Sequence, residues 1–441
     1  MWRLEYLNLL NAHCCDSLHI DFLHTGSREG EDYVIDGVFL EAQSDPHLVA
    51  KLDSRGEYRW TVWSDDKVLL ASRGFSSLFE EWQSTIGRRD NNLCQTFRET
   101  LVVPWYLGAT LKIERRSGGE HFKAIYEAEL DAVANLAIAQ MVPPSRSLRS
   151  LYEGGRCSFL ILSEGYSLAE EELFIAEAER ACAVILSASP YRELLPSISV
   201  SALFVPSRNS GIPKNLAEQD TTNFNTAYGI LGMERYLVST NMHAVRRAVF
   251  GIHYSTLVVM ANASAYGGSG IFNSHCCVPG GMAQEDLRYV LLHELGHSLG
   301  GLGDEYFTSP VSYLINESMS RSPWEPNISS LDLQGRVKWS ELIRPDIPVP
   351  TPWSHAEYLA LSLDPSSVSE VGSHQAYVTG CARDAQENLL NHETFKGEIG
   401  AFEGAHYLPF GLYRPEVDCR MFSKTSTHYC TVCEETIRYS I

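Results

Sequence analysis

The sequence predicts a multidomain protein in which an N-terminal all-β sandwich precedes an α/β domain. Three observations predict this fold class: the length of the chain, short alternating segments in its first third, and a strand–helix–strand pattern after them. At about 150 residues per domain, the 441 residues correspond to two or three domains. Hydrophobic residues make up 44% and charged residues 20%, which is close to the globular average and argues against wholesale disorder.

The first third of the chain alternates apolar and polar residues in short runs that are bounded by Gly, Asp and Ser. Such a period of two is typical of strands with one buried face. The clearest runs cover residues 19–23, 33–39, 58–63 and 110–113. We therefore expect these strands to form a β-sandwich.

A change of pattern marks the predicted domain boundary. Residues 140–150 contain two prolines and three serines, which suits a surface connection, so we divide the chain into domains 1–145 and 146–441. Beyond the boundary, the apolar run 158–162 precedes a helical pattern over 171–187, and a second apolar run covers 197–205. This order predicts a right-handed βαβ unit with parallel strands, and hence an α/β domain.

Charge and hydropathy exclude two classes of partner. The formal net charge of −20 repels phosphate backbones, so we expect no nucleic-acid partner. No apolar run approaches the roughly 20 residues needed to span a bilayer, so we expect no membrane span. The first residues, 1–13, show no signal peptide.

The pattern most indicative of chemistry is an HExxH motif on a predicted amphipathic helix over 284–299. His293 and His297 are four residues apart and share one helical face, so both imidazoles can reach one ion. Glu294, about 100° round the helix from His293, can lie beside a water at an open coordination position. This arrangement is typical of hydrolytic zinc sites, in which the carboxylate acts as general base.

Two histidines leave a catalytic zinc ion one protein ligand short. In the long zinc-peptidase signature HExxHxxGxx(H/D), Gly300 matches the turn glycine, but the third-ligand position is Gly303, which has no side chain. The first candidate ligands are Asp304 and Glu305. We expect the shorter Asp304 to bind the ion and Glu305 to orient a ligand imidazole; a glutamate further downstream is the alternative.

Several segments resemble a known family. The central one is HELGHSLGGLGDEY at 293–306, and the others are RGFSSLFEEWQ (73–83), SEGYS (163–167), AYGGSG (265–270), GAFEGAHY (400–407), YRPEVDCRM (413–421) and YCTVC (429–433). Together they resemble the IgA peptidase-like zinc metallopeptidases, over most of the chain.

The resemblance implies an N-terminal β-sandwich accessory domain and a metzincin-like catalytic domain. It also implies zinc-dependent endopeptidase activity with one catalytic Zn²⁺, on a host or other extracellular protein or peptide, outside the cell or at its surface. By this likeness His293, His297 and Asp304 bind zinc and Glu294 is the base. Met421 would form the methionine turn beneath the metal.

Three cysteines gather near the end of the chain: Cys419, Cys430 and Cys433. We favour a local disulfide that braces the methionine loop over free thiols or a second metal. His275, Cys276 and Cys277 are adjacent, and adjacent residues rarely converge on one ion, so we expect no metal there.

Two further expectations concern function. A glycan- or host-protein-binding surface protein with a structural zinc site is the alternative to an enzyme, although a structural site has no use for Glu294. Residues 255–260 and 265–270 precede the zinc helix as a predicted edge strand. Its glycines, Gly268 among them, predict an uncovered backbone to which an extended peptide could add as a strand.

Overall fold

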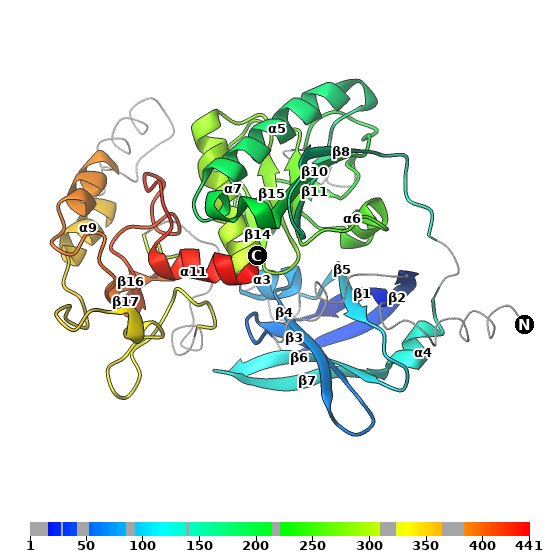
Figure 1. Cartoon of the computed structure of the whole chain (residues 1–441), viewed down its shortest axis with the longest axis horizontal. Helices are drawn as coiled ribbons and strands as arrows, with labels where there is room; N and C mark the ends of the chain where they lie inside the picture. Colours follow the sequence, from blue (N-terminus) through cyan, green and yellow to red (C-terminus); the bar gives the residue numbers. More distant parts are fainter. Residues whose placement is uncertain are drawn as a thin grey trace, which may run out of the picture.

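The computed structural model describes residues 16–27, 30–41, 53–84, 93–137, 141–213, 221–308, 323–363 and 383–441. Figure 1 shows a β-rich N-terminal region in blue and cyan, a mixed α/β region in green, and a loop-rich C-terminal region in yellow to red. The predicted order, β-rich region first and α/β region second, is confirmed. The boundary between residues 145 and 146 stays a prediction.

Two antiparallel sheets form the N-terminal region. A three-stranded sheet has the order β2-β1-β5 and a four-stranded sheet the order β4-β3-β6-β7. Alternate residues of both sheets, such as Ile20 of one and Trp60 of the other, belong to one buried core. The elements are β1 (Ser17–Gly26), β2 (Glu31–Glu41), β3 (Tyr58–Trp63), β4 (Leu69–Phe75), α3 (Leu78–Ser84), β5 (Gln95–Pro104), β6 (Thr110–Gly118), β7 (His121–Glu129) and α4 (Leu130–Ala134).

A six-stranded mixed sheet with the order β14-β15-β13-β9-β10-β8 is the framework of the α/β region. The predicted βαβ unit is confirmed, because β9 and β10 pair in parallel on either side of α5 in the chain. The elements are β8 (Ser147–Tyr152), β9 (Cys157–Glu164), η3 (Leu168–Glu170), α5 (Glu171–Ser187), η4 (Tyr191–Ser197), β10 (Ile198–Phe204), β11 (Thr226–Ala227), η6 (Ile230–Gly232), β12 (Val238–Ser239), α6 (Met242–Val249), β13 (Thr256–Ala261), β14 (Ser269–Ile271), β15 (His275–Pro279) and α7 (Gln284–Gly300).

Both faces of this sheet are covered, which explains why its central strands are continuously apolar. Alternate strand residues such as Phe159 and Val258 pack with α5 and α7 in one core. Their neighbours, such as Leu160 and Val259, pack with α6 in another. The helix α7, which carries the HExxH motif, is thus held against one face of the sheet.

Within its described residues, the C-terminal region combines long loops with few regular elements. They are η7 (Ser340–Leu342), α9 (His355–Leu363), β16 (Phe402–Ala405), β17 (Leu408–Arg414) and α11 (Thr431–Ser440). Ile437 of α11 and Leu299 of α7 belong to the same core. Within the described ranges, no helix is both long and apolar enough to cross a bilayer.

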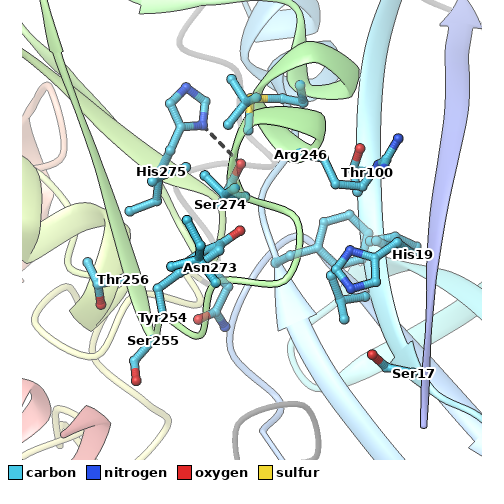
Figure 2. Close-up of a pocket in the computed structure, with 18 of the residues that line it drawn as sticks. Ser17, His19, Thr100, Arg246, Tyr254, Ser255, Thr256, Asn273, Ser274 and His275 are labelled. Atoms are coloured by element: carbon cyan, nitrogen blue, oxygen red, sulfur yellow. Dashed lines mark hydrogen bonds between the residues drawn. The ribbon is translucent and has the colours of Figure 1, made fainter. Parts of the chain in front are cut away.

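A cavity of about 900 Å³ lies between the β-rich region and the α/β region. Figure 2 shows His19 and Thr100 on one side of it and Ser274 and His275 on the other. Nδ1 of His275 lies 3.0 Å from Oγ of Ser274, and burial lowers the pKa of His275 to about 4, so its imidazole is neutral. This cavity is larger than the one around the HExxH motif, yet none of the motif's polar residues lines it.

The side chains of the adjacent His275, Cys276 and Cys277 do not converge on one point. They lie on β15, where successive side chains point to opposite faces. Cys276 accordingly belongs to the core with α7 and Cys277 to the core with α6.

A buried ion pair joins the two regions. The Nε and Nη2 atoms of Arg246 on α6 lie 2.5 and 2.6 Å from the two carboxylate oxygens of Asp21 on β1. Thr100 donates a third hydrogen bond to Asp21 at 2.8 Å. The Arg246 and Asp21 side chains are only 3% and 2% exposed. Such a pair fixes the relative position of the regions, because each charge depends on the other for stabilisation.

Replacing Asp21 with alanine is expected to lower the free energy of unfolding by about 3–5 kcal/mol, because it leaves the Arg246 charge buried without its partner. Urea unfolding measures the loss. Arg336→Ala is the matched control: it breaks an ion pair with Asp332 whose side chains are 65% and 40% exposed, and it should lower the free energy of unfolding far less, because water screens an exposed pair. Equal losses in the two variants would contradict this role for Asp21.

Candidate metal centre

The helix α7 and the turn after it place the motif residues. Acidic Glu285 and Asp286 lie in its first turn, where negative charge is favourable. The helix ends when Gly301 adopts a left-handed conformation with φ of 64°, which favours glycine. Its amide donates to the His297 carbonyl at 2.9 Å. The chain thereby turns back beside the helix and brings Asp304 to the histidines.

Three side chains converge on one point, and we call them the metal triad: His293, His297 and Asp304. Oδ1 of Asp304 lies 3.0 Å from Nε2 of His293 and 3.3 Å from Nε2 of His297. The two Nε2 atoms are 3.2 Å apart. Ligands about 2.0–2.1 Å from a tetrahedral zinc ion would be about 3.3–3.4 Å from one another, so the three atoms fit one face of such a coordination sphere.

The hydrogen bonds of the imidazoles favour a cation at this point. Nδ1 of His293 lies 3.1 Å from the Arg420 carbonyl oxygen, and Nδ1 of His297 lies 2.6 Å from the Leu302 carbonyl oxygen. Carbonyls only accept, so both Nδ1 atoms carry the proton. In the neutral imidazoles, both Nε2 lone pairs then face each other and the Asp304 carboxylate, and a shared metal ion reconciles them.

The ionisation of the triad supports the same conclusion. Burial disfavours a charged Asp304, but imidazoles that also carry a proton at Nε2 bring its pKa well below the usual range, through the positive charge on His297 and a hydrogen bond from His293. Burial likewise lowers the pKa of His297, yet Asp304 raises it to about 10. The triad thus stabilises positive charge at Nε2, the charge that a divalent cation supplies.

Glu294 faces a cavity of about 200 Å³ that the triad also lines. Its side chain is half-buried, and burial raises the pKa of its carboxyl. Tyr289 of α7 and Tyr306 near Asp304 also line the cavity. Other lining residues come from more distant parts of the chain: Glu80, Glu81, Arg235, Tyr266, Trp324, Glu325 and Tyr407. Glu80 and Glu81 belong to α3, so the β-rich region contributes to the rim of the cavity.

Tyr407 was not singled out in the sequence analysis. Its hydroxyl donates to Oδ2 of Asp304, which orients the carboxylate. His406 and Tyr407 have φ of 49° and 65°, and their amides donate to the carbonyls of Asp304 and Tyr306, both at 3.0 Å. Residues other than glycine rarely adopt this backbone conformation except where the surrounding structure requires it. The only signal in the sequence was the family-like segment 400–407.

The expectation that Glu305 orients a ligand imidazole is wrong. Its Oε1 lies 2.9 Å from Nδ2 of Asn327 and 3.3 Å from Sγ of Cys433, so the carboxylate points away from the histidines. After the helix ends, the side chains of these two adjacent residues point in different directions. Of the two, Asp304 lines the cavity and Glu305 does not.

Met421 is fully buried beneath α7. A Cβ atom added at Gly296, between the two histidines of the motif, would lie 2.7 Å from Sδ of Met421. The methionine therefore packs against the segment that carries His293 and His297. Its backbone carbonyl accepts from the Glu305 amide at 2.8 Å, which links the methionine loop to the loop that carries Asp304.

The local disulfide favoured at the C-terminal end is not present. Cys419, Cys430 and Cys433 are free, and the sulfurs of Cys419 and Cys433 are 4.0 Å apart, about twice the length of an S–S bond.

The prediction of an uncovered backbone at Gly268 is also wrong. β14 is an edge strand, but the Gly268 amide just before it donates to the Arg235 carbonyl at 3.1 Å. A Cβ atom at Gly268 would lie 2.7 Å from Val290 and 3.0 Å from Oε1 of Glu294. The glycine therefore permits close packing against α7 and leaves room for the Glu294 carboxylate.

Comparisons with known proteins identify the family to which most of the chain is similar. A family model described as IgA Peptidase M64 matches residues 149–441. A second model, described as Peptidase M64 N-terminus, matches residues 11–127. A comparison with curated proteins found no match.

Proposed function

This chain belongs to the IgA peptidase M64 family of metallopeptidases, and from this premise we propose that it is a zinc-dependent endopeptidase that hydrolyses peptide bonds in protein substrates. The observation that carries the proposal is the convergence of His293, His297 and Asp304 within 3.0–3.3 Å of one another, beside the Glu294 carboxylate. We further propose that residues 146–441 form a metzincin-like catalytic domain and residues 1–145 a β-sandwich accessory domain.

The residues of the chain have separate roles in this reaction. His293, His297 and Asp304 would hold one zinc ion, which when bound lowers the pKa of a water towards 7 and polarises the scissile carbonyl. Glu294 takes the proton of the water as its oxygen attacks the carbonyl carbon. The same carboxylate then returns the proton to the amine that leaves. Burial raises the pKa of the Glu294 carboxyl, which helps the carboxylate to accept the proton.

The surroundings of the triad hold these groups in place. The Arg420 and Leu302 carbonyls fix the two imidazoles, and the Tyr407 hydroxyl fixes Asp304. Gly268 leaves room for Glu294. Because α3 lies at the rim of the cavity, the accessory domain would contact the substrate and contribute to its selection. We propose an extracellular or cell-surface protein as that substrate.

Digestion of a peptide library by the full chain tests the proposal. Cleavage at internal bonds is expected, together with its loss after treatment with a zinc chelator and its recovery when zinc is added back. Cleavage that persists without metal would refute the zinc mechanism. No cleavage by the zinc-loaded chain, with specific binding to a glycan array, would favour the surface-binding alternative instead.

A further inference from the structure

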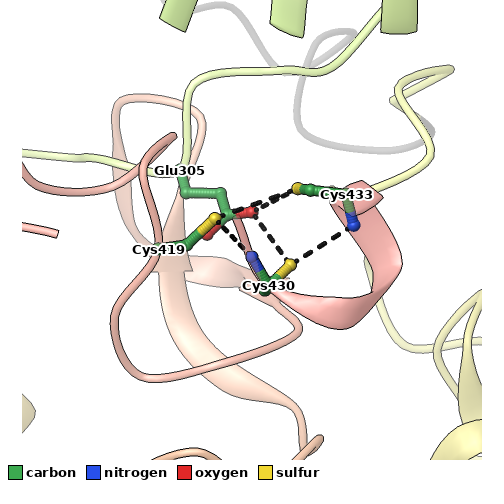
Figure 3. Close-up of side chains that lie close together, drawn as sticks. All are labelled: Glu305, Cys419, Cys430 and Cys433. Atoms are coloured by element: carbon green, nitrogen blue, oxygen red, sulfur yellow. Dashed lines mark hydrogen bonds between the residues drawn. The ribbon is translucent and has the colours of Figure 1, made fainter. Parts of the chain in front are cut away.

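A second group of metal-ligating side chains lies apart from the metal triad, and we call it the Glu–Cys cluster: Glu305, Cys419, Cys430 and Cys433. Figure 3 shows the carboxylate and the three sulfurs pointing toward one another from three separate segments of the chain. All four residues are 0% exposed, so water does not hydrogen-bond to their ligand atoms.

The spacing of the ligand atoms fits one ion. All four lie within 4.8 Å of one another. Sγ of Cys419 and Sγ of Cys433 are 4.0 Å apart, and Oε1 of Glu305 lies 3.3 Å from Sγ of Cys433 and 3.9 Å from Sγ of Cys430. For zinc, with bonds of about 2.3 Å to sulfur and about 2.0 Å to oxygen, a tetrahedron has edges of about 3.8 Å and 3.5 Å.

The polar groups around the cluster also favour a bound cation. Oε2 of Glu305 is buried and has no hydrogen-bond partner among the described residues, which is costly for a carboxylate. The Cys430 amide donates to Sγ of Cys419 at 3.1 Å, and the Cys433 amide donates to Sγ of Cys430 at 3.4 Å. Such N–H···S bonds orient sulfur ligands and stabilise the thiolate form that binds metal.

From this geometry we infer that Glu305, Cys419, Cys430 and Cys433 bind a structural zinc ion, separate from the ion of the metal triad. With four protein ligands the site is closed, and it has no open position for water, so it serves folding rather than catalysis. The buried Arg414 guanidinium interacts electrostatically with Glu305 and Cys419 and offsets part of the negative charge that three thiolates and a carboxylate bring to the ion.

The position of this site gives it a specific task. Glu305 directly follows Asp304, and Cys419 directly precedes Arg420, whose carbonyl accepts from His293. Cys430 is the N-cap of α11 and Cys433 lies in its first turn. An ion at this point therefore ties α11 to the two loops that position Asp304 and His293.

Metal analysis of the full chain, purified without chelator, tests the inference. We expect two zinc equivalents per chain in the wild type and one in the double variant His293→Ala/His297→Ala. The double variant Cys430→Ser/Cys433→Ser and the single variant Glu305→Gln should lose the other equivalent. Cys182→Ser is the matched control, because Cys182 is a buried, free cysteine of α5 outside the cluster, and it should keep both.

Cobalt substitution keeps the test decisive if the cysteine variants fail to fold. In His293→Ala/His297→Ala the Glu–Cys cluster is unaltered, so bound cobalt should show thiolate-to-metal charge-transfer absorption, which a site of histidine and aspartate cannot give. Absence of that absorption, iron in place of zinc, or a disulfide among the three cysteines in the unreduced intact mass would overturn the inference. None of these outcomes depends on whether the chain cleaves peptides.

Discussion

Replacing Glu294 with glutamine is expected to lower kcat/KM for peptide hydrolysis by about 10²- to 10⁴-fold, the usual contribution of a general base. The amide has nearly the shape of the carboxylate, so it fits the space beside Gly268 but cannot accept the proton of the attacking water. The zinc content should not change, because Glu294 does not belong to the metal triad. Peptide kinetics and metal analysis of the same preparation measure both effects.

Glu285→Gln is the matched control for this variant. Glu285 lies in the first turn of the same helix α7 and is exposed, so its substitution removes the same charge without touching the cavity. Its activity should stay near that of the wild type. If Glu294→Gln kept wild-type activity, the proposed proton transfer would be wrong. A loss of zinc in that variant would instead show that Glu294 helps to hold the ion.

Replacing Asp304 with asparagine is expected to abolish both peptide hydrolysis and zinc binding at the triad. The substitution removes the negative charge that lies within 3.0–3.3 Å of both Nε2 atoms. The loss in metal affinity should exceed the 10- to 100-fold typical of residues that only orient a ligand. Metal titration followed by kinetics at saturating zinc separates loss of the ion from loss of chemistry.

Glu305→Gln provides the direct comparison, because the two carboxylates are adjacent in the chain. It should leave zinc bound at the triad and remove the thiolate-bound ion, so the cobalt form should lose its charge-transfer absorption. Asp304→Asn should keep that absorption. The reverse pattern would show that the two carboxylates have been assigned to the wrong sites.

The parts of this protein that could be predicted from its sequence depend on contacts between close neighbours in the chain. His293 and His297 share a face because a helix repeats every 3.6 residues. The βαβ unit of β9, α5 and β10 follows from an apolar run, a capping box at Ser167 and Glu170, and a second apolar run. Each of these patterns lies within a short stretch of sequence, and the structure contains the helix and the βαβ unit that they predict.

Contacts between distant segments had no comparable signal. Tyr407 meets Asp304 across 103 positions of the chain, and Cys433 meets Glu305 across 128. The sequence narrowed the third ligand to Asp304 or Glu305, but the directions of two adjacent side chains depend on what packs around them. Asp304 faces the histidines, and Glu305 faces three thiols. Because the sequence did not show Glu305 as a fourth ligand beside the three cysteines, it favoured a disulfide among them.

The packing around Gly268 could not be predicted from the sequence either. In the sequence it indicated an open strand edge, because glycine carries no side chain. In the structure, its amide donates a hydrogen bond to the Arg235 carbonyl, and the lack of a Cβ atom leaves room for Val290 and Glu294. The sequence by itself determined the order of the β-rich and α/β regions and the helix that carries the HExxH motif, since both follow from local periodicity. Only the tertiary structure decided which loops meet that helix, because long-range packing depends on the shape and charge of all the segments together.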